Sequence, residues 1–380
     1  MSDSRFLESI DNLKPLIKIR TGRTPKTEVC RQISSCLQQG RLFYAAAAES
    51  PLEIKPLQLF YGMLGFAKAL VLGRSLHGLE TLPQTHGIRD VSAGNARISD
   101  LRVKIEGDGT FQRFNDVCAP LTRIPYFEGT STPAIRYVPS MKAVNLHGLE
   151  LSLKDILGRI PTLDDLFRET FNELPCCEYF QFQNNNDRWT LEVFDRELFR
   201  DRESLGKLVA AWRSRFPFLK QWRFDEASHH WGRSYVKFDN FAIEPAGRDE
   251  FGEEFLNASA NGFTAKLTQK AVNDPMRVLP SLAGGWGNPT YAIVPVQGKD
   301  VSEFSLHFLG MFLLSSLVRY RPHTWVNALS RSIIEGHPAD DTVLALIEKF
   351  LDLNALDIPS FVIKAMNPHL DEFDKGLIPI

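Results

Sequence analysis

The sequence predicts an α+β protein in which helical regions at the two ends of the chain flank a β-rich middle. Stretches with apolar residues three or four apart dominate both ends, whereas short alternating stretches bounded by Gly, Asn and Asp concentrate in the middle. Strands and helices segregated in this way favour α+β over a doubly wound sheet. A chain of 380 residues is long enough for two or three domains, and we expect the regions 1–175, 176–300 and 301–380.

The N-terminal region is expected to be mainly helical. Val29, Ile33 and Leu37 recur every four residues, as on one face of a helix. A later helix should begin near Pro56 and, because it is apolar nearly all round, should be buried. Further expected elements are a β-hairpin near 102–114, with its turn at Gly107-Asp-Gly109, and short helices at 152–159 and 162–171.

The middle region should supply most of the strands. Residues 178–194 alternate around a polar, Asn-rich turn, which predicts a hairpin. The other expected elements are a helix over 196–215, strands at 218–224 and 234–238, a long Gly-rich loop over 245–290 and a strand at 291–296. The C-terminal region is expected to hold helices over 302–321, 323–334, 340–351 and 360–365.

Composition and charge indicate a globular, cytoplasmic protein. The formal net charge of -2 and the 43% hydrophobic residues exclude both disorder and a generally basic nucleic-acid coat protein. The N-terminus lacks a secretory signal pattern, and the most apolar stretch, 304–318, is shorter than the ~20 residues that span a bilayer. Five irregularly spaced cysteines indicate reduced thiols instead of a disulfide framework.

The common catalytic and cofactor motifs are missing from the chain. It contains no GxxxxGK[ST], HExxH or GxSxG pattern, and Gly284-Gly-Trp-Gly287 lacks the spacing of a dinucleotide-binding turn. Adjacent Cys176 and Cys177 have no CxxC partner for zinc. We therefore expect no cofactor and no metal.

A more specific candidate for a functional residue is a lysine within the apolar helix expected after Pro56. Tyr61 and Lys68 are seven residues apart, so they lie on one stripe of that helix. A lysine in so apolar a helix either reaches solvent along the helix surface or meets a buried acceptor. The first interpretation is favoured; the second predicts that Tyr61 and Lys68, together with Lys55, face a site for an anion.

His86 and two arginines are further candidates for such a site. His86 precedes Gly87 in a loop-like segment, and its ordinary pKa near neutrality suits a general acid or base, although a hydrogen bond to loop backbone is the commoner role. Arg319 and Arg321 end the most apolar helix. Cations there complement the helix dipole, and two guanidinium groups could also hold a phosphate.

Tryptophan and arginine residues are interleaved in the middle region, notably Trp222, Arg223, Trp231 and Arg233. Rings that stack on bases and guanidinium groups that contact phosphates would form a nucleic-acid platform. Alternation alone produces the same pattern, with the tryptophans in the core and the arginines in solvent. The core interpretation is favoured.

Several short motifs occur in an order that is shared with a known family. They are Lys55-Pro56, Tyr61, Lys68-Ala, His86-Gly87, the segment 102–114, Ile160-Pro161 and the ending Arg319-Tyr320 to Trp325. In this order they resemble the YaaC-like proteins of bacteria, over about residues 40–352. The resemblance implies a cytoplasmic bacterial protein and assigns no catalytic residue.

Two functions from different classes are expected. The first is binding of nucleic acid or a nucleotide, with a nuclease-like role in defence against phage; Lys55, Lys68, Arg319 and Arg321 would hold the anion and His86 would transfer protons. The second is a non-enzymatic interaction module or scaffold that binds a protein partner or a second copy, because 27 Phe and 6 Trp residues are typical of interfaces when exposed. No membrane partner is expected, and whether the protein is an enzyme stays open.

Overall fold

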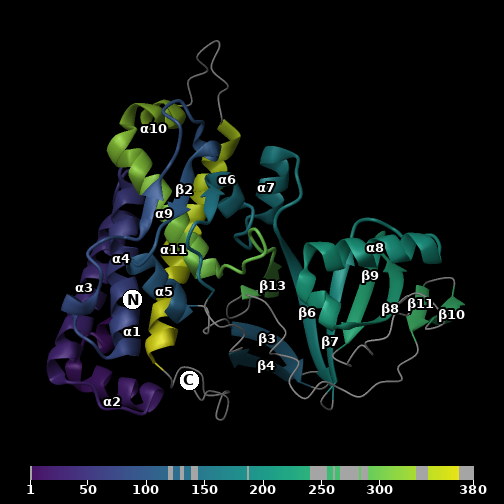
Figure 1. Ribbon diagram of the computed structural model, residues 1–380, viewed down its shortest axis with the longest axis horizontal. Coiled ribbons are helices and arrows are strands. Elements are labelled where there is room, and N and C mark those ends of the chain that lie inside the picture. Colours follow the sequence, from purple (N-terminus) through teal and green to yellow (C-terminus); the bar gives the residue numbers. More distant parts are fainter. Residues whose placement is uncertain are drawn as a thin grey trace.

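The computed structural model describes residues 2–118, 123–128, 132–137, 144–185, 188–239, 255–259, 262–265, 282–283, 290–330 and 341–367. Its architecture is α+β, which confirms the predicted fold class (Figure 1). Helices from both ends of the chain pack together on one side, and an extended sheet with a covering helix forms the other side. The N-terminal and C-terminal helical regions therefore share one core.

The helical part surrounds a small antiparallel sheet. Its helices are α1 (Ser2–Leu7), α2 (Ile10–Thr21), α3 (Thr27–Ala48), α4 (Lys55–Ser75), α5 (Thr110–Cys118), α6 (Leu153–Leu157), α7 (Asp164–Phe171), α9 (Glu303–Tyr320), α10 (Pro322–Leu329) and α11 (Asp341–Met366). Strands β1 (Ile88–Asp90), β2 (Arg102–Ile105) and β5 (Glu150–Ser152) pair in the order β1-β2-β5.

Two helices, α4 and α9, form the centre of this part. Every residue of α9 from Ser305 to Leu317 is buried. Between Leu59 and Gly73, every residue of α4 is buried except Tyr61 and Lys68. Both helices are apolar nearly all round, so a shell of other helices must cover them.

Helix α4 also meets the length and apolarity expected of a membrane span, and among the described residues no other helix does. Most of it is covered by other parts of the protein, as in the core helix of a globular fold. The predicted stretch at 304–318 is likewise a buried core helix, within α9.

The β-rich part is a long sheet. Its strands are β3 (Arg123–Glu128), β4 (Thr132–Tyr137), β6 (Cys177–Asn185), β7 (Arg188–Asp195), β8 (Arg223–His230), β9 (Arg233–Asp239), β10 (Phe255–Ser259), β11 (Gly262–Ala265), β12 (Leu282–Ala283) and β13 (Thr290–Ile293). The order is β10-β11-β8-β9-β7-β6-β13-β12, and β3 pairs with β4 and, in parallel, with β6. Helix α8 (Arg202–Arg215) packs on this sheet through a second core that includes Phe180, Trp212 and Phe238.

Three sequence expectations need correction. Residues 102–114 do not form a hairpin: β2 pairs with β1 and β5, and helix α5 follows the Gly107-Asp-Gly109 turn. The reason is that Phe111 and Phe114 are three residues apart, which is helical spacing, and both are buried. The segment 218–224, expected as a strand, is mostly a 3-10 turn before β8. The two helices expected at 340–351 and 360–365 are one helix, α11, which continues through Pro359.

The expected Gly-rich loop over 245–290 lies largely outside the described residues. Its described parts are the short strands β10, β11 and β12.

The helical hairpin of α3 and α4 depends on close approach of the two backbones. A Cβ atom on Gly65 would lie 3.0 Å from the carbonyl oxygen of Cys36 and 3.0 Å from the amide nitrogen of Gly40. Because backbone atoms in a helix cannot easily move, glycine at this position sets the distance between the helices.

We expect Gly65→Ala to destabilise the protein by about 1–3 kcal/mol, because overpacking outweighs the better helix propensity of alanine. Thermal or urea unfolding measures the change. Gly73→Ala on the same helix is the matched control: its Cβ would meet only the flexible end of Met366, at 3.2 Å. Equal stability of the two variants would contradict the close-approach interpretation.

Candidate functional site

The candidate site begins with the half-buried stripe of α4 that carries Tyr61 and Lys68. The Tyr61 ring stacks on Phe43 of α3, with 5.6 Å between ring centroids. Burial raises the pKa of the Cys36 thiol, and the charge of Lys68 lowers it. Lys68 therefore lies within electrostatic range of Cys36. In the part of the chain that the structure describes, the Lys68 ammonium has no hydrogen bond or ion pair.

His86 lies against the same helix. Its imidazole packs edge-on to Phe60 of α4 at 5.5 Å and to Phe312 of α9 at 6.2 Å. The backbone of its loop is held by α5, where the Phe111 amide donates to the His86 carbonyl oxygen at 3.0 Å. Gly87, at φ +71°, lets the loop turn closely past the start of α5.

Arg319 reaches this position from the end of α9. Its Nε donates to the Ser315 carbonyl oxygen at 3.2 Å, and its guanidinium lies 4.9 Å from the centre of the Tyr320 ring. Burial lowers the pKa of His86, and the nearby charges of Arg319 and Lys68 lower it further. The two cations therefore lie within electrostatic range of the imidazole, as the anion hypothesis requires.

We name Lys68, His86 and Arg319 the cationic cluster. Burial and the two cations lower the pKa of its imidazole, which favours the neutral form of the ring. A neutral imidazole can accept a proton, and the two cations can bind an anion beside it. All three side chains are partly exposed, so a ligand from solvent can reach them.

The other two cations of the predicted site have structural partners. Lys55 pairs with Asp352 of α11 at 3.3 Å. Arg321 donates to the backbone carbonyl oxygens of Ala93 at 2.6 Å and Ser92 at 3.1 Å, so it anchors the loop after β1. Both cations therefore already have partners within the protein, and those of Arg321 are backbone carbonyl oxygens.

The structure does not assemble the predicted Trp/Arg platform as a whole. Trp222 is fully buried in the second core, because alternation along the chain places it with Phe224 under α8 and the bases of a nucleic acid cannot reach it. Arg233 is exposed, and Trp231 is 97% exposed at the turn between β8 and β9. The side chain of Arg223 lies outside the described residues.

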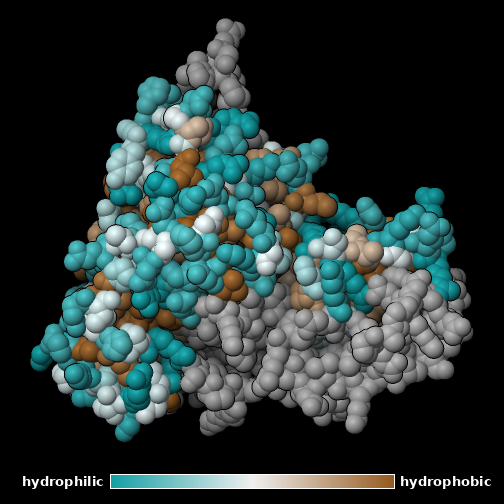
Figure 2. Space-filling model, in the orientation of Figure 1, coloured by the Kyte–Doolittle hydropathy of each residue, from teal (hydrophilic) through white to brown (hydrophobic). Residues whose placement is uncertain are grey.

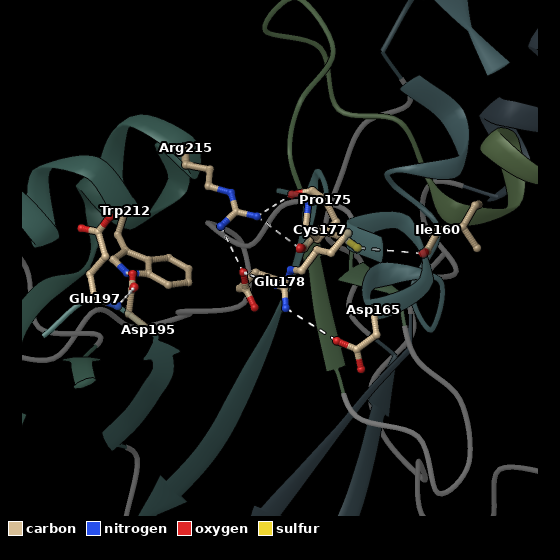
Figure 3. A network of polar contacts seen from close by, with 10 residues as sticks. Ile160, Asp165, Pro175, Cys177, Glu178, Asp195, Glu197, Trp212 and Arg215 are labelled. Carbon is tan, nitrogen blue, oxygen red and sulfur yellow. Dashed lines mark hydrogen bonds and ion pairs between the residues drawn. The ribbon is translucent and has the colours of Figure 1, made fainter. Parts of the chain in front are cut away.

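A hollow of about 510 Å³ lies where α7, β6 and α8 meet. Figure 3 shows Arg215 reaching from α8 to Glu178 of β6, at 3.0 Å, and to the Pro175 carbonyl oxygen, at 2.6 Å. Burial raises the pKa of Glu178, and Arg215 opposes that effect. Trp212 donates to Asp195 at 2.6 Å on another wall. Glu178 and Arg215 bind each other, so this pair and the Pro175 carbonyl oxygen tie α8 to the start of β6.

The sequence analysis did not identify Tyr320 as part of the candidate site, nor the pair of Glu178 and Arg215 in the hollow. Tyr320 is 71% exposed next to the cationic cluster, and its position directly after Arg319 was the available signal. Glu178 and Arg215 are far apart in the sequence, and no spacing rule connects them.

The cationic cluster predicts how the His86 pKa should respond to loss of each charge. Lys68→Met and Arg319→Met should both raise that pKa, since each removes a cation that disfavours the imidazolium form. An NMR titration of the imidazole protons measures it. Lys55→Met, which removes a cation paired with Asp352, should leave the value unchanged. A His86 pKa that is the same in all four proteins would show that the cluster does not exist.

Comparison with known proteins assigns the chain to a family. The family model described as YaaC-like protein matches residues 11–366, which run from the start of α2 to the end of α11 and include nearly all of both cores. Searches of curated proteins and of solved structures find no match. The match covers nearly the whole chain, in agreement with the resemblance of its motifs, and the chain therefore belongs to the YaaC-like protein family.

Proposed function

We propose that the protein binds the phosphate group of a nucleotide or of RNA at the cationic cluster, in the cytoplasm. The observation that supports the proposal is that the charges of Arg319 and Lys68 both lower the His86 pKa, so both cations lie within electrostatic range of one imidazole. Lys68 lacks a partner among the described residues, and an anionic ligand would supply one.

An exposed aromatic ring favours a nucleotide over a bare phosphate. Tyr320 is 71% exposed, and its ring lies beside the Arg319 guanidinium. Base stacking on such a ring contributes about 1–3 kcal/mol per base. A phosphate on the cations and a base on Tyr320 would together select nucleotide ligands.

The neutral imidazole extends the proposal to RNA cleavage without a metal. His86 could accept the proton of a ribose 2′-hydroxyl as the 2′-oxygen attacks the phosphorus and displaces the 5′-oxygen, which takes a proton from water, while Lys68 and Arg319 stabilise the charge that develops on the phosphate. A nuclease-like activity of this kind would suit a role in defence against phage.

Binding is tested by fluorescence anisotropy with a labelled single-stranded RNA and by competition with ATP. Lys68→Met and Arg319→Met should each weaken binding by about tenfold or more, since each removes a charged hydrogen-bond donor. The salt dependence of binding should also decrease by about one phosphate contact in each variant. Lys55→Met is the matched control and should bind as the unaltered protein does.

Cleavage is tested by incubating the same RNA with the unaltered protein and with His86→Gln. Loss of cleavage with retained binding would support the nuclease extension, whereas intact RNA in both samples would reject it and leave phosphate binding in place. Failure of the unaltered protein to bind either RNA or ATP would overturn the whole proposal.

The alternative function as an interaction module rests on a different observation. Trp231 is 97% exposed and has a φ of +53°, a conformation that costs energy for a residue with a side chain. Figure 2 shows a largely hydrophilic face on which apolar residues form small separate areas. Among the large apolar side chains that the structure describes, the Trp231 indole is the most exposed, which makes it the feature best suited to contact a protein partner or a second copy.

Light scattering tests this alternative. If the indole binds a second copy, the unaltered protein should form a dimer and Trp231→Ser should be a monomer. A monomer in both cases, at every concentration measured, would remove the homo-oligomer version of the alternative.

A further inference from the structure

Three side chains with metal-binding groups meet between α9 and α11. Glu303 and His307 are one turn apart on α9, and Asp357 comes from α11. One ligand atom from each, a carboxylate oxygen or an imidazole nitrogen, lies within 4.8 Å of the other two. Three atoms at this spacing can surround one ion after small side-chain movements, because metal–ligand distances are about 2.0–2.2 Å for nitrogen and oxygen.

The imidazole of His307 leaves one nitrogen for a ligand. Its Nδ1 lies 3.3 Å from Nδ2 of Asn354, whereas Nε2 is completely buried and lacks a hydrogen-bond partner among the described residues. The ring is held in orientation by stacking on Phe350, with 5.0 Å between centroids. A buried nitrogen without a partner is costly, and a bound ion would satisfy it.

Asn354 can support a metal-bound imidazole from behind. Its Oδ1 accepts a hydrogen bond from the Tyr44 hydroxyl at 2.8 Å, and its Nδ2 is 3.7 Å from the Met63 sulfur. If the amide turns over, Nδ2 donates to the Tyr44 hydroxyl oxygen, Oδ1 accepts the Nδ1–H of His307, and Nε2 has a free lone pair for the ion. An outer partner of this type is the usual companion of a metal-binding histidine.

We propose that Glu303, His307 and Asp357 bind a divalent transition-metal ion. Two carboxylates balance its charge, and a mixed nitrogen and oxygen set suits Zn²⁺, Mn²⁺ or Fe²⁺ better than Ca²⁺ or Mg²⁺. His307 is fully buried, while Glu303 and Asp357 are partly exposed, so the ion can enter from the carboxylate side and a water molecule can complete its coordination.

This metal site is separate from the cationic cluster. His307 and Arg319 are both on α9 and, at 1.5 Å per residue, lie about 18 Å apart along it. The ion would instead tie α9 to α11, at a place where Phe304 and Phe361 also stack. Its direct effect is therefore on stability, and the ion would not contact the residues of the cationic cluster.

The full-length protein, stripped with EDTA and dialysed, is titrated with Zn²⁺, Mn²⁺ and Co²⁺ in separate calorimetric experiments. We expect one ion per chain, a higher melting temperature in its presence, and a visible absorption spectrum for the Co²⁺ form. Glu303→Gln and His307→Gln should each weaken binding of the ion and abolish this spectrum.

His323→Gln is the control for adventitious binding, because His323 is an exposed histidine on α10. It should bind metal as the unaltered protein does. Absence of stoichiometric binding of all three ions, or equal affinity in the unaltered protein and in Glu303→Gln, would overturn the proposal. If His307→Gln fails to fold, Glu303→Gln and the Co²⁺ spectrum still decide the question.

Discussion

Burial of two helices that are apolar nearly all round is the constraint on which the rest of the structure depends. Helices α4 and α9 cannot each hide an apolar surface against a single neighbour, so helices from both ends of the chain must close around them. Contact between α4 and α3 is close enough that glycine is required at Gly40 and Gly65. The β-rich part needs its own helix, α8, and forms a second core.

The same constraint gives unusual properties to the few polar groups on these helices. Burial lowers the pKa of His307 to about 3, and burial together with Asp357 raises the pKa of Glu303 to about 8. Ser316, also on α9, is satisfied by a hydrogen bond to Asp90 at 2.7 Å. Polar groups in such surroundings must be paired, neutral or bound to a ligand. Charged and titratable residues on α4 and α9 are therefore the places where function is expected.

Local patterns in the sequence predicted most helices and strands, but they could not predict contacts between residues that are far apart in the sequence. The seven-residue interval between Tyr61 and Lys68 predicted a shared stripe, and the structure leaves these two residues of the central part of α4 partly exposed. No spacing rule could place His86 beside Arg319, since a loop and a distant helix bring them together. Glu303 and His307 stand four residues apart, a visible signal on one helix, but Asp357 completes the cluster only through the packing of α11.

Helix α9 gives the two candidate sites a mechanical connection. Its first half carries Glu303 and His307 against α11, and its end carries Arg319 toward His86. A buried helix moves as a rigid body, because interiors are close-packed and compress little. Any contact that fixes the position of α9 relative to α11 therefore also limits where the Arg319 guanidinium can lie. An ion between α9 and α11 would help to hold the cationic cluster in place without touching its ligand.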